Sequence, residues 1–355
     1  MDELQKARRI IDGVDRQMAL LFEQRMEAVR QVVAYKRKHG LPIKDAGRED
    51  EVIQKNLALL EDQSLAPYYA DYIRHQMALS RQYQARLLGW DTVAYQGMEG
   101  AFSHIALSNL FPHARAQNYS SWNDVFQAVE EGDAAYGVLP FENSTAGDVS
   151  AVLDLCFGHS LHVVQMYDLP VSQNLMGLPG ASLADIRQVY SHPQAISQSE
   201  RFLRTMGIQA SPRSNTAEAA RFVADRGDRT CAAIASAETA ALYGLQILAR
   251  DINTEGDNTT RFIVIGKELP PHGNRFSLLF AADHKAGMLA NVIQEIGAAG
   301  FNMECIKSRP MPHVPFEYYF YVELVGDAFS EEAQTLLERL QKVCRTVRLL
   351  GVYDR

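Results

Sequence analysis

One arginine lies on what the sequence predicts to be an apolar helix seam. Residues 2–39 contain no proline, and every third or fourth residue is suited to burial, so we predict one long helix there. Arg25 occupies one position of that seam. A guanidinium among apolar side chains costs free energy unless an anion pairs with it. We therefore expect Arg25 to meet either a buried acid or an anionic ligand.

Other polar residues fall on shared helix faces. Arg25 and Lys36 are eleven residues apart, which places them about 20° out of phase on a helix. Arg8 is about 100° from Arg25 by the same arithmetic, so the two need not address one site on a straight helix; a second, symmetry-related site in a dimer is one alternative for Arg8. Two more clusters have i, i+3 or i, i+4 spacing: Asp45, Arg48 and Glu49 on a second helix, and Ser80 and Gln84 on a third. The alternative for each is a solvated side chain, and for Asp45 an N-cap.

Four polar segments follow or adjoin predicted strands further along the chain. They are residues 94–104, 137–147, 191–198 and 258–262, and each mixes glycine or small residues with hydroxyl or amide side chains. Such loops offer backbone N–H groups to anions, although each alone could be an ordinary turn. The stretch Ser191-His192-Pro193 has no companion acid or nucleophile elbow, so we predict no hydrolase triad.

Composition restricts the class of protein. The chain has 355 residues, enough for two or three domains, and a formal charge of −8 that argues against nucleic acid as a partner. The four cysteines are scattered without metal-ligand spacing, which favours a reduced cytoplasm. The charged, helical start and the lack of a long apolar run predict neither a signal peptide nor a membrane span. We expect neither a metal nor a cofactor.

The pattern of elements predicts three domains. Residues 1–88 read as three helices, with a break at residues 40–42, a second helix from Asp45 and a third over 67–88. Strands and helices alternate over residues 91–268, which predicts an α/β domain with a mainly parallel sheet. After a linker at 269–274, residues 275–355 predict a βαββαβ ferredoxin-like unit. The predicted strands are 92–95, 135–138, 161–165, 188–190, 232–235 and 262–265, then 276–282, 302–309, 316–325 and 347–353, with C-terminal helices at 286–300 and 330–343.

The helical region resembles the all-helical chorismate mutase domain, a domain-swapped dimer in which the long first helices cross between subunits. The family's motif falls on Arg8, Arg25, Lys36, Asp45, Arg48, Glu49, Ser80 and Gln84. The resemblance implies that Arg25 and Arg48, with Arg8 of the partner subunit, hold the carboxylates of chorismate. It further implies that Lys36 and Gln84 donate to the ether oxygen, and that Glu49 and the Asp45 region hold the ring hydroxyl. This rearrangement to prephenate needs no nucleophile and no proton transfer, only a held conformer and stabilised charge.

The four polar segments together resemble prephenate dehydratase, including the signature Thr260-Arg261-Phe262. The family fold is two α/β lobes with the substrate cleft between them, like a periplasmic binding protein. The resemblance implies that Thr260 donates a proton to the departing hydroxide and that Arg261 grips a carboxylate. The residues that would line the cleft are Glu142, Asn143, Ser144, Ser191, Gln198 and Phe262. Gln96 is a departure, since many members carry glycine there.

The C-terminal unit resembles the ACT-type amino-acid sensor found in bifunctional prephenate dehydratases. Its two effector motifs fall on Gly287-Met288-Leu289-Ala290 and Lys307-Ser308-Arg309-Pro310. The resemblance implies that L-phenylalanine binds there and that Ser308 and Arg309 of one chain lie near the Gly287 loop of another. Met288 and Lys307 depart from the usual alanine and glutamate. We therefore expect phenylalanine to inhibit this protein only at a higher concentration than it inhibits a family member with both motifs intact. The substitution Lys307→Glu should lower that concentration. The alternative is a domain that serves only dimerisation.

These features predict a bifunctional enzyme of phenylalanine biosynthesis. It would convert chorismate to prephenate and prephenate to phenylpyruvate, as a homodimer or larger homo-oligomer. One alternative is a dehydratase whose helical domain serves only dimerisation. Another is a non-catalytic amino-acid-binding regulator, since two-lobed and sensor domains both bind small acids. Chorismate and then prephenate, supplied to the purified protein, separate the three.

Overall fold

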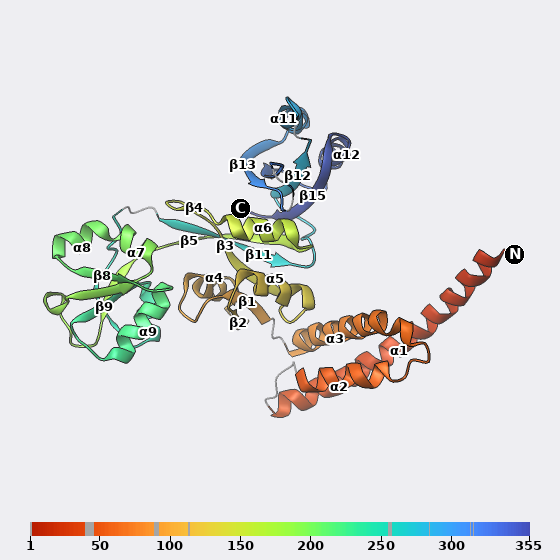
Figure 1. Ribbon diagram of the computed structural model, residues 1–355, viewed down its shortest axis with the longest axis horizontal. Coiled ribbons are helices and arrows are strands. Elements are labelled where there is room, and N and C mark those ends of the chain that lie inside the picture. The colour runs from red at the N-terminus through yellow and green to blue at the C-terminus, as the bar shows by residue number, and fades with distance from the viewer. Residues whose placement is uncertain are drawn as a thin grey trace. The chain divides into compact units, whose positions relative to one another are not determined.

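The computed structural model describes residues 2–39, 46–88, 92–112, 114–254, 258–283, 285–312, 314 and 316–355. The chain divides into two compact units. The first comprises residues 1–92 with 131–135, and the second comprises residues 93–130 with 136–355. Helices dominate the first unit, whereas the second contains two sheets and the helices that cover them (Figure 1).

The helical unit has the three long helices that the sequence predicts. They are α1 (Glu3–His39), α2 (Ala46–Leu57) and α3 (Ala66–Leu88), with a 3-10 turn, η1 (Gln63–Leu65), before α3. Val29 and Val33 on α1 are buried and pack against Tyr83 and Leu87 of α3. This contact fixes the C-terminal third of α1 on α3.

The N-terminal half of α1 extends beyond α2 and α3 and exposes an apolar stripe (Figure 1). The exposed apolar side chains on this stretch are Leu4, Ile10, Ile11, Val14, Met18, Leu20, Leu21 and Phe22. Within the described part of the chain nothing covers this stripe. An apolar helix face of this length is typical of a surface that packs against another helix.

The first lobe of the second unit is built on one arm of a large sheet. The strands are β1 (Thr92–Gln96), β2 (Arg115–Tyr119), β3 (Tyr136–Asn143), β5 (His162–Pro170) and β11 (Thr259–Gly266), in the order β5-β11-β3-β1-β2. A two-residue strand, β4 (Gly147–Asp148), pairs with the end of β3. Helices α4 (Phe102–Leu110), α5 (Trp122–Glu131) and α6 (Ser150–Gly158) complete the lobe.

The second lobe has its own five-stranded sheet in the order β10-β6-β9-β7-β8. The strands are β6 (Asn174–Gly177), β7 (Gln188–Ser191), β8 (Gln209–Pro212), β9 (Cys231–Ala235) and β10 (Gln246–Ala249). The helices are α7 (Pro193–Gln198), α8 (Glu200–Met206), α9 (Thr216–Arg226) and α10 (Ala237–Leu242), with a 3-10 turn, η2 (Leu183–Asp185). The predicted two-lobed α/β fold is therefore confirmed.

The prediction of a mainly parallel sheet is wrong, because both sheets are mixed. β1–β3, β7–β8 and β7–β9 are parallel pairs. By contrast, β11 lies antiparallel between β3 and β5, and β6 is antiparallel to β9 and β10. The reason is that the chain leaves the first lobe after β5 and returns in β11, which then fills the gap between two existing strands. The sequence analysis did not predict β2, β4, β6, β8 or β10; of these, β2 and β8 are polar and form no apolar run.

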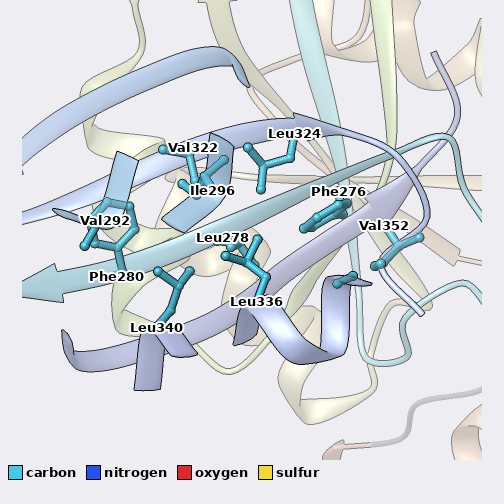
Figure 2. Close-up of a cluster of buried hydrophobic side chains, with 12 residues drawn as sticks. Phe276, Leu278, Phe280, Val292, Ile296, Val322, Leu324, Leu336, Leu340 and Val352 are labelled. Atoms are coloured by element: carbon cyan, nitrogen blue, oxygen red, sulfur yellow. The ribbon is translucent and has the colours of Figure 1, made fainter. Parts of the chain in front are cut away.

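The C-terminal domain has the predicted βαββαβ order. Its elements are β12 (Arg275–Ala282), α11 (Met288–Ala298), β13 (Asn302–Pro310), β14 (Tyr318–Val325), α12 (Glu331–Val343) and β15 (Cys344–Tyr353). The strands lie in the order β13-β14-β12-β15, with antiparallel neighbours. Figure 2 shows the core between the sheet and the two helices, where Phe276, Phe280 and Leu278 meet Ile296 and Leu336.

One close strand contact joins this domain to the first lobe. Gly351 of β15 pairs with Val163 of β5 in parallel, so that the two sheets form one ten-stranded sheet. A Cβ at Gly351 would lie 2.4 Å from the Val163 carbonyl oxygen. Glycine is therefore required where the two backbones approach each other. None of the described helices is both long enough and apolar enough to span a membrane.

Candidate active sites

The helical unit contains a cavity of about 230 Å³ between α1, α2 and α3. Six of the predicted mutase residues line it: Arg25, Lys36, Arg48, Glu49, Ser80 and Gln84. The other lining residues are Val29, Val32, Val52, Met77 and Arg81. Four of these side chains are cationic and one is acidic, so the cavity is suited to an anion.

Arg25 has no carboxylate partner in the described part of the chain. Its guanidinium donates to the Ser80 hydroxyl and, at 3.4 Å, to the Gln76 carbonyl oxygen. Burial lowers the pKa of Arg25, with the phenol of Tyr72 acting in the opposite direction. Of the two partners that the sequence predicts for Arg25, the buried acid is not found among the described residues.

The acidic residue of the cavity, Glu49, forms an ion pair with Arg81, which also pairs with Asp133. Arg81 Nη1 donates to Glu49 Oε1 at 2.6 Å, and both side chains are largely buried. Sequence analysis missed Arg81, which follows Ser80 on the third predicted helix. The contact between Arg81 on α3 and Glu49 on α2 depends on how the two helices pack, and the periodicity within one helix does not predict that packing.

Two further polar groups complete the wall of the cavity. Arg48 Nη1 donates to Glu51 Oε2 at 2.6 Å, and hydrogen bonds from Lys55 and Arg48 lower the pKa of Glu51 to about 2. The amide oxygen of Gln84 is buried and has no hydrogen-bond partner among the described residues. Because amide oxygen and nitrogen can be exchanged by a flip of the side chain, Gln84 can present a donor or an acceptor to a ligand.

The two remaining mutase predictions have different outcomes. Arg8 is exposed on α1 and does not line this cavity. It precedes Arg25 by seventeen residues, about 25 Å along a helix, which exceeds the reach of an arginine side chain. Asp45 lies outside the described residues.

The second cavity, of about 90 Å³, lies between the two lobes. Three predicted dehydratase residues line it, namely Asn143, Gln198 and Thr260. The lining also includes Phe102, Val171, Gln173, His192, Gln194, Ala195 and Asn258. Phe102, His192, Gln194 and Asn258 belong to the polar segments found in the sequence. Sequence analysis missed Gln173, which lies outside those segments.

Asn143 fixes the hydroxyl of Thr260. The amide nitrogen of Asn143 donates to Thr260 Oγ1 at 2.9 Å and to Asn258 Oδ1 at 2.8 Å. Its amide oxygen accepts from the backbone nitrogens of Thr145 and Ala146 at 3.1 and 2.9 Å. Backbone N–H groups only donate, so the orientation of this amide is determined. Thr260 therefore accepts from Asn143, and its own proton is available to a group in the cavity.

Gln198 connects the two lobes across this cavity. Its amide oxygen accepts from Asn258 at 3.0 Å and from Gln173 at 3.2 Å, while its nitrogen donates to Thr145 Oγ1 at 3.2 Å. His192 is the N-cap of α7, and its Nδ1 accepts from the Gln194 nitrogen at 3.2 Å. Burial lowers the pKa of His192, so this ring is neutral at pH 7.

The prediction that Glu142 and Arg261 line the cleft with Thr260 does not match the structure. Arg261 Nε donates to Asp168 at 2.9 Å, and its Nη1 donates to Glu142 at 3.3 Å. Successive side chains of a strand face opposite sides of the sheet, so Thr260 and Asn143 face the cavity while Arg261 and Glu142 face away from it. Burial opposes the charge of Arg261, but the hydrogen bond to Asp168 and the surrounding carboxylates raise its pKa.

Three further predicted cleft residues serve the fold around the cavity. Ser144 Oγ accepts from the Thr259 nitrogen at 2.9 Å. Ser191 is fully buried and donates to the Ile234 carbonyl oxygen at 2.6 Å. Phe262 lies in the apolar core of the first lobe. None of the three is among the residues that line the described cavity.

The predicted effector residues lie on two elements of the C-terminal domain. Gly287 adopts the left-handed conformation at φ 83° as N-cap of α11, whereas Met288 and Leu289 are half-buried in its first turn. Ser308 is exposed on β13. Arg309 makes two hydrogen bonds to Asp154 of α6, at 2.9 and 2.6 Å, and Tyr319 donates to the same carboxylate at 2.7 Å. Arg309 thus contacts the first lobe.

Both sites fall within regions that match known families. Residues 7–85 match chorismate mutase type II, and residues 93–270 match prephenate dehydratase. The bifunctional chorismate mutase/prephenate dehydratase of Aquifex aeolicus is 30% identical over 100% of this chain and 99% of its own length. The enzyme of the same name from Neisseria gonorrhoeae is 32% identical over 98% of this chain and 95% of its own.

A solved structure agrees with the fold of the second unit. Prephenate dehydratase from Arthrobacter aurescens, solved in complex with L-Phe, is 27% identical and superposes with a TM-score of 0.69. The similarity covers 74% of this chain and 90% of that one. With the matches of both enzymatic regions and relatives that align along the whole sequence, this chain belongs to the family of bifunctional chorismate mutase/prephenate dehydratases.

Proposed function

We propose that the cavity of the helical unit rearranges chorismate to prephenate, and that the cavity at Thr260 converts prephenate to phenylpyruvate. The observation that supports the first activity best is Arg25, a guanidinium with reduced exposure and no acid partner among the described residues. For the second activity it is the Thr260 hydroxyl, which Asn143 orients so that its proton is free.

In the mutase cavity, the protein holds a conformer and stabilises charge. Chorismate carries two carboxylates, and arginines bind carboxylates with paired hydrogen bonds. Arg25 and Arg48 would hold them, with Ser80 keeping the Arg25 guanidinium in place. Lys36 and Gln84 would donate to the ether oxygen, where negative charge develops as the C–O bond breaks. Glu49, held by Arg81, would accept from the ring hydroxyl.

We propose that a second copy of this chain covers the exposed half of α1. The apolar side chains from Leu4 to Phe22 lack cover within the described residues, and Arg8 lies among them. A twofold arrangement would bring the Arg8 of the partner subunit to the cavity that Arg8 cannot reach in its own chain.

In the dehydratase cavity, the reaction removes carbon dioxide and the ring hydroxyl together. The C–CO₂ bond breaks, its electron pair enters the ring, and the hydroxyl departs from the opposite carbon with a proton from Thr260. The product ring is aromatic, which drives the step. Asn143 donates to Thr260 and so stabilises the alkoxide that forms on proton transfer. Gln198 and Asn258 line the same cavity and are positioned to bind the substrate, and a proton from solvent water would restore the Thr260 hydroxyl.

Regulation by L-phenylalanine is the third part of the proposal. The βαββαβ order of the C-terminal domain is compatible with an ACT-type sensor, and a prephenate dehydratase of similar fold was solved in complex with L-Phe. The Gly287 turn would supply backbone contacts, with Met288 and Leu289 beside it and Ser308 from a neighbouring copy. Arg309, which holds Asp154, would transmit the change to the dehydratase lobe.

We further propose domains at residues 1–88, 91–268 and 275–355, and a reducing compartment such as the cytoplasm. The four cysteines, Cys156, Cys231, Cys305 and Cys344, are all free thiols. Burial raises the pKa of Cys156 to about 12, so that this thiol is unreactive.

One experiment separates the candidate functions. The purified full chain is supplied with chorismate and the products prephenate and phenylpyruvate are followed; prephenate is then supplied alone. Both conversions are expected. Turnover of prephenate only would reduce the helical unit to a dimerisation module, and turnover of neither substrate would leave an amino-acid-binding regulator.

A further inference from the structure

A lysine of the C-terminal domain reaches the dehydratase lobe. Lys307 lies on β13, and its side chain is only 8% exposed. Its ammonium is 3.3 Å from Glu142 Oε2 and donates to Asp148 Oδ1. The same group lies 4.9 Å from the centre of the Phe141 ring. A buried ammonium with two carboxylates and an aromatic face is well compensated, and each of these partners belongs to the first lobe.

The two carboxylates are the two sides of one short hairpin. Glu142 on β3 pairs with Asp148 on β4, and the next pair is Asn143 with Gly147. The loop between them, residues 144–146, donates two backbone hydrogen bonds to the Asn143 amide oxygen. The hairpin that Lys307 holds is therefore the one that orients Asn143 and, through it, the Thr260 hydroxyl.

The charges of the hairpin require a cation. Glu142 and Asp148 are directly opposite each other on antiparallel strands, where like charges repel. Lys307 forms ion pairs with both carboxylates, and Arg261 Nη1 also lies 3.3 Å from Glu142 Oε2. Without Lys307, Asp148 would have no ion-pair partner among the described residues, and the two strands of the hairpin would be pushed apart.

We propose that Lys307 is a positioning residue for the dehydratase reaction, whose ammonium holds the Glu142–Asp148 hairpin so that Asn143 presents the Thr260 hydroxyl correctly. This rests on the proposed dehydratase function. It also reverses the expectation drawn from the effector motif, where Lys307→Glu would improve inhibition. A third carboxylate beside Glu142 and Asp148 would disrupt the hairpin instead.

The first test compares Lys307→Met, Lys307→Arg and a control, Lys342→Met, which changes an exposed lysine of the same domain. Misplacement of a catalytic group by about 1 Å can cost about a hundredfold in rate, so Lys307→Met is expected to lower the kcat for prephenate by about ten- to a hundredfold. KM should change less than about threefold, because the Thr260 proton acts in the transition state. Lys307→Arg should retain most of the activity, and Lys342→Met all of it.

A second variant distinguishes positioning from loss of folding. Asp148→Asn removes one of the two facing carboxylates, so adding it to Lys307→Met should relieve their repulsion and restore part of kcat. If Lys307 only stabilises the fold, the losses of kcat caused by the two substitutions should add in the double variant, and its thermal midpoint should fall in parallel. Unchanged kcat in Lys307→Met, or additive losses, would overturn the proposal. A wild-type chain inactive on prephenate would overturn the proposed function itself.

Discussion

Thr260 and Arg261 are neighbours on β11, yet they serve opposite faces of the sheet. Thr260 accepts from Asn143 on the cavity side, whereas Arg261 holds Asp168 and Glu142 on the other side. The Thr260-Arg261-Phe262 signature therefore combines a candidate catalytic residue, Thr260, with a residue that stabilises the fold, Arg261. Arg261 fixes the strands beside β11, and Thr260 uses the resulting geometry.

Thr260→Val should separate the role of the hydroxyl from that of the side-chain shape. Valine has nearly the same shape without the O–H group, so prephenate turnover should fall by about a hundredfold or more if Thr260 is the general acid. Thr260→Ser should keep much of the turnover, and mutase turnover should be normal in both. The matched control is Thr205→Val, since that hydroxyl only donates to a carbonyl within α8. Equal prephenate turnover in the Val and Ser variants at position 260 would exclude the hydroxyl as proton donor.

Arg25→Ala should abolish mutase turnover and leave dehydratase turnover on added prephenate nearly intact. Loss of a charged contact to a substrate carboxylate weakens transition-state binding by about 2–5 kcal/mol. Arg74→Ala, which removes an exposed arginine of the same unit, is the control. Steady-state kinetics with each substrate give the answer, and a normal mutase rate in Arg25→Ala would contradict the assignment of this cavity.

The elements were predictable from sequence where their signals are local. The period of α1 and the βαββαβ order of the C-terminal domain depend on residues a few positions apart, and both predictions were confirmed. The pairing of β11 between β3 and β5 joins segments about a hundred residues apart, and no local pattern specifies that register. For the same reason, the sequence identified Arg25, Thr260 and Arg261 as candidates but did not predict that Arg261 contacts Asp168 and Glu142. Lys307 is similar: its motif suggested an effector site, whereas its contacts come from tertiary packing.

Gly351→Ala should weaken the junction between β15 and β5. The new methyl group would collide with the Val163 backbone, and overpacking of this kind costs about 1–3 kcal/mol. Gly297→Ala is the control, because a Cβ there meets no atom within 4 Å and alanine favours the helix by about 0.5–1 kcal/mol. Calorimetry should therefore show a lower thermal midpoint for Gly351→Ala and a slightly higher one for Gly297→Ala. A midpoint for Gly351→Ala equal to that of the wild type would show that the two strands separate freely.

Asp154→Asn should lower stability by a constant amount from pH 8 to pH 5. The hydrogen bond from Arg309 lowers the pKa of Asp154, with Tyr319 acting in the same direction against burial. A depressed carboxyl pKa stabilises the fold above the unfolded value of about 3.9, and this contribution is lost as the pH falls through the folded pKa. Both side chains are about one-third exposed, so we expect about 1 kcal/mol after solvent screening. The measurement is the thermal midpoint of the variant and of the wild type across this pH range. A difference between the two midpoints that becomes smaller above pH 5 would contradict the role of the Arg309–Asp154 pair.

Mixing two inactive variants tests whether the mutase site is shared between subunits. Arg8→Ala and Arg25→Ala should each lack mutase turnover as pure proteins. In a mixed dimer, one cavity combines an intact Arg25 with the intact Arg8 of the partner subunit, while the other cavity has neither. Random exchange makes half of the dimers mixed, so about a quarter of wild-type turnover should return.

The control mixes Arg25→Ala with Arg48→Ala, both of which alter residues that line the same cavity within one chain. That mixture should stay inactive, because each cavity then lacks one of the two arginines. Failure of the first mixture to recover activity, after subunit exchange is verified by mass spectrometry, would place Arg8 outside the site.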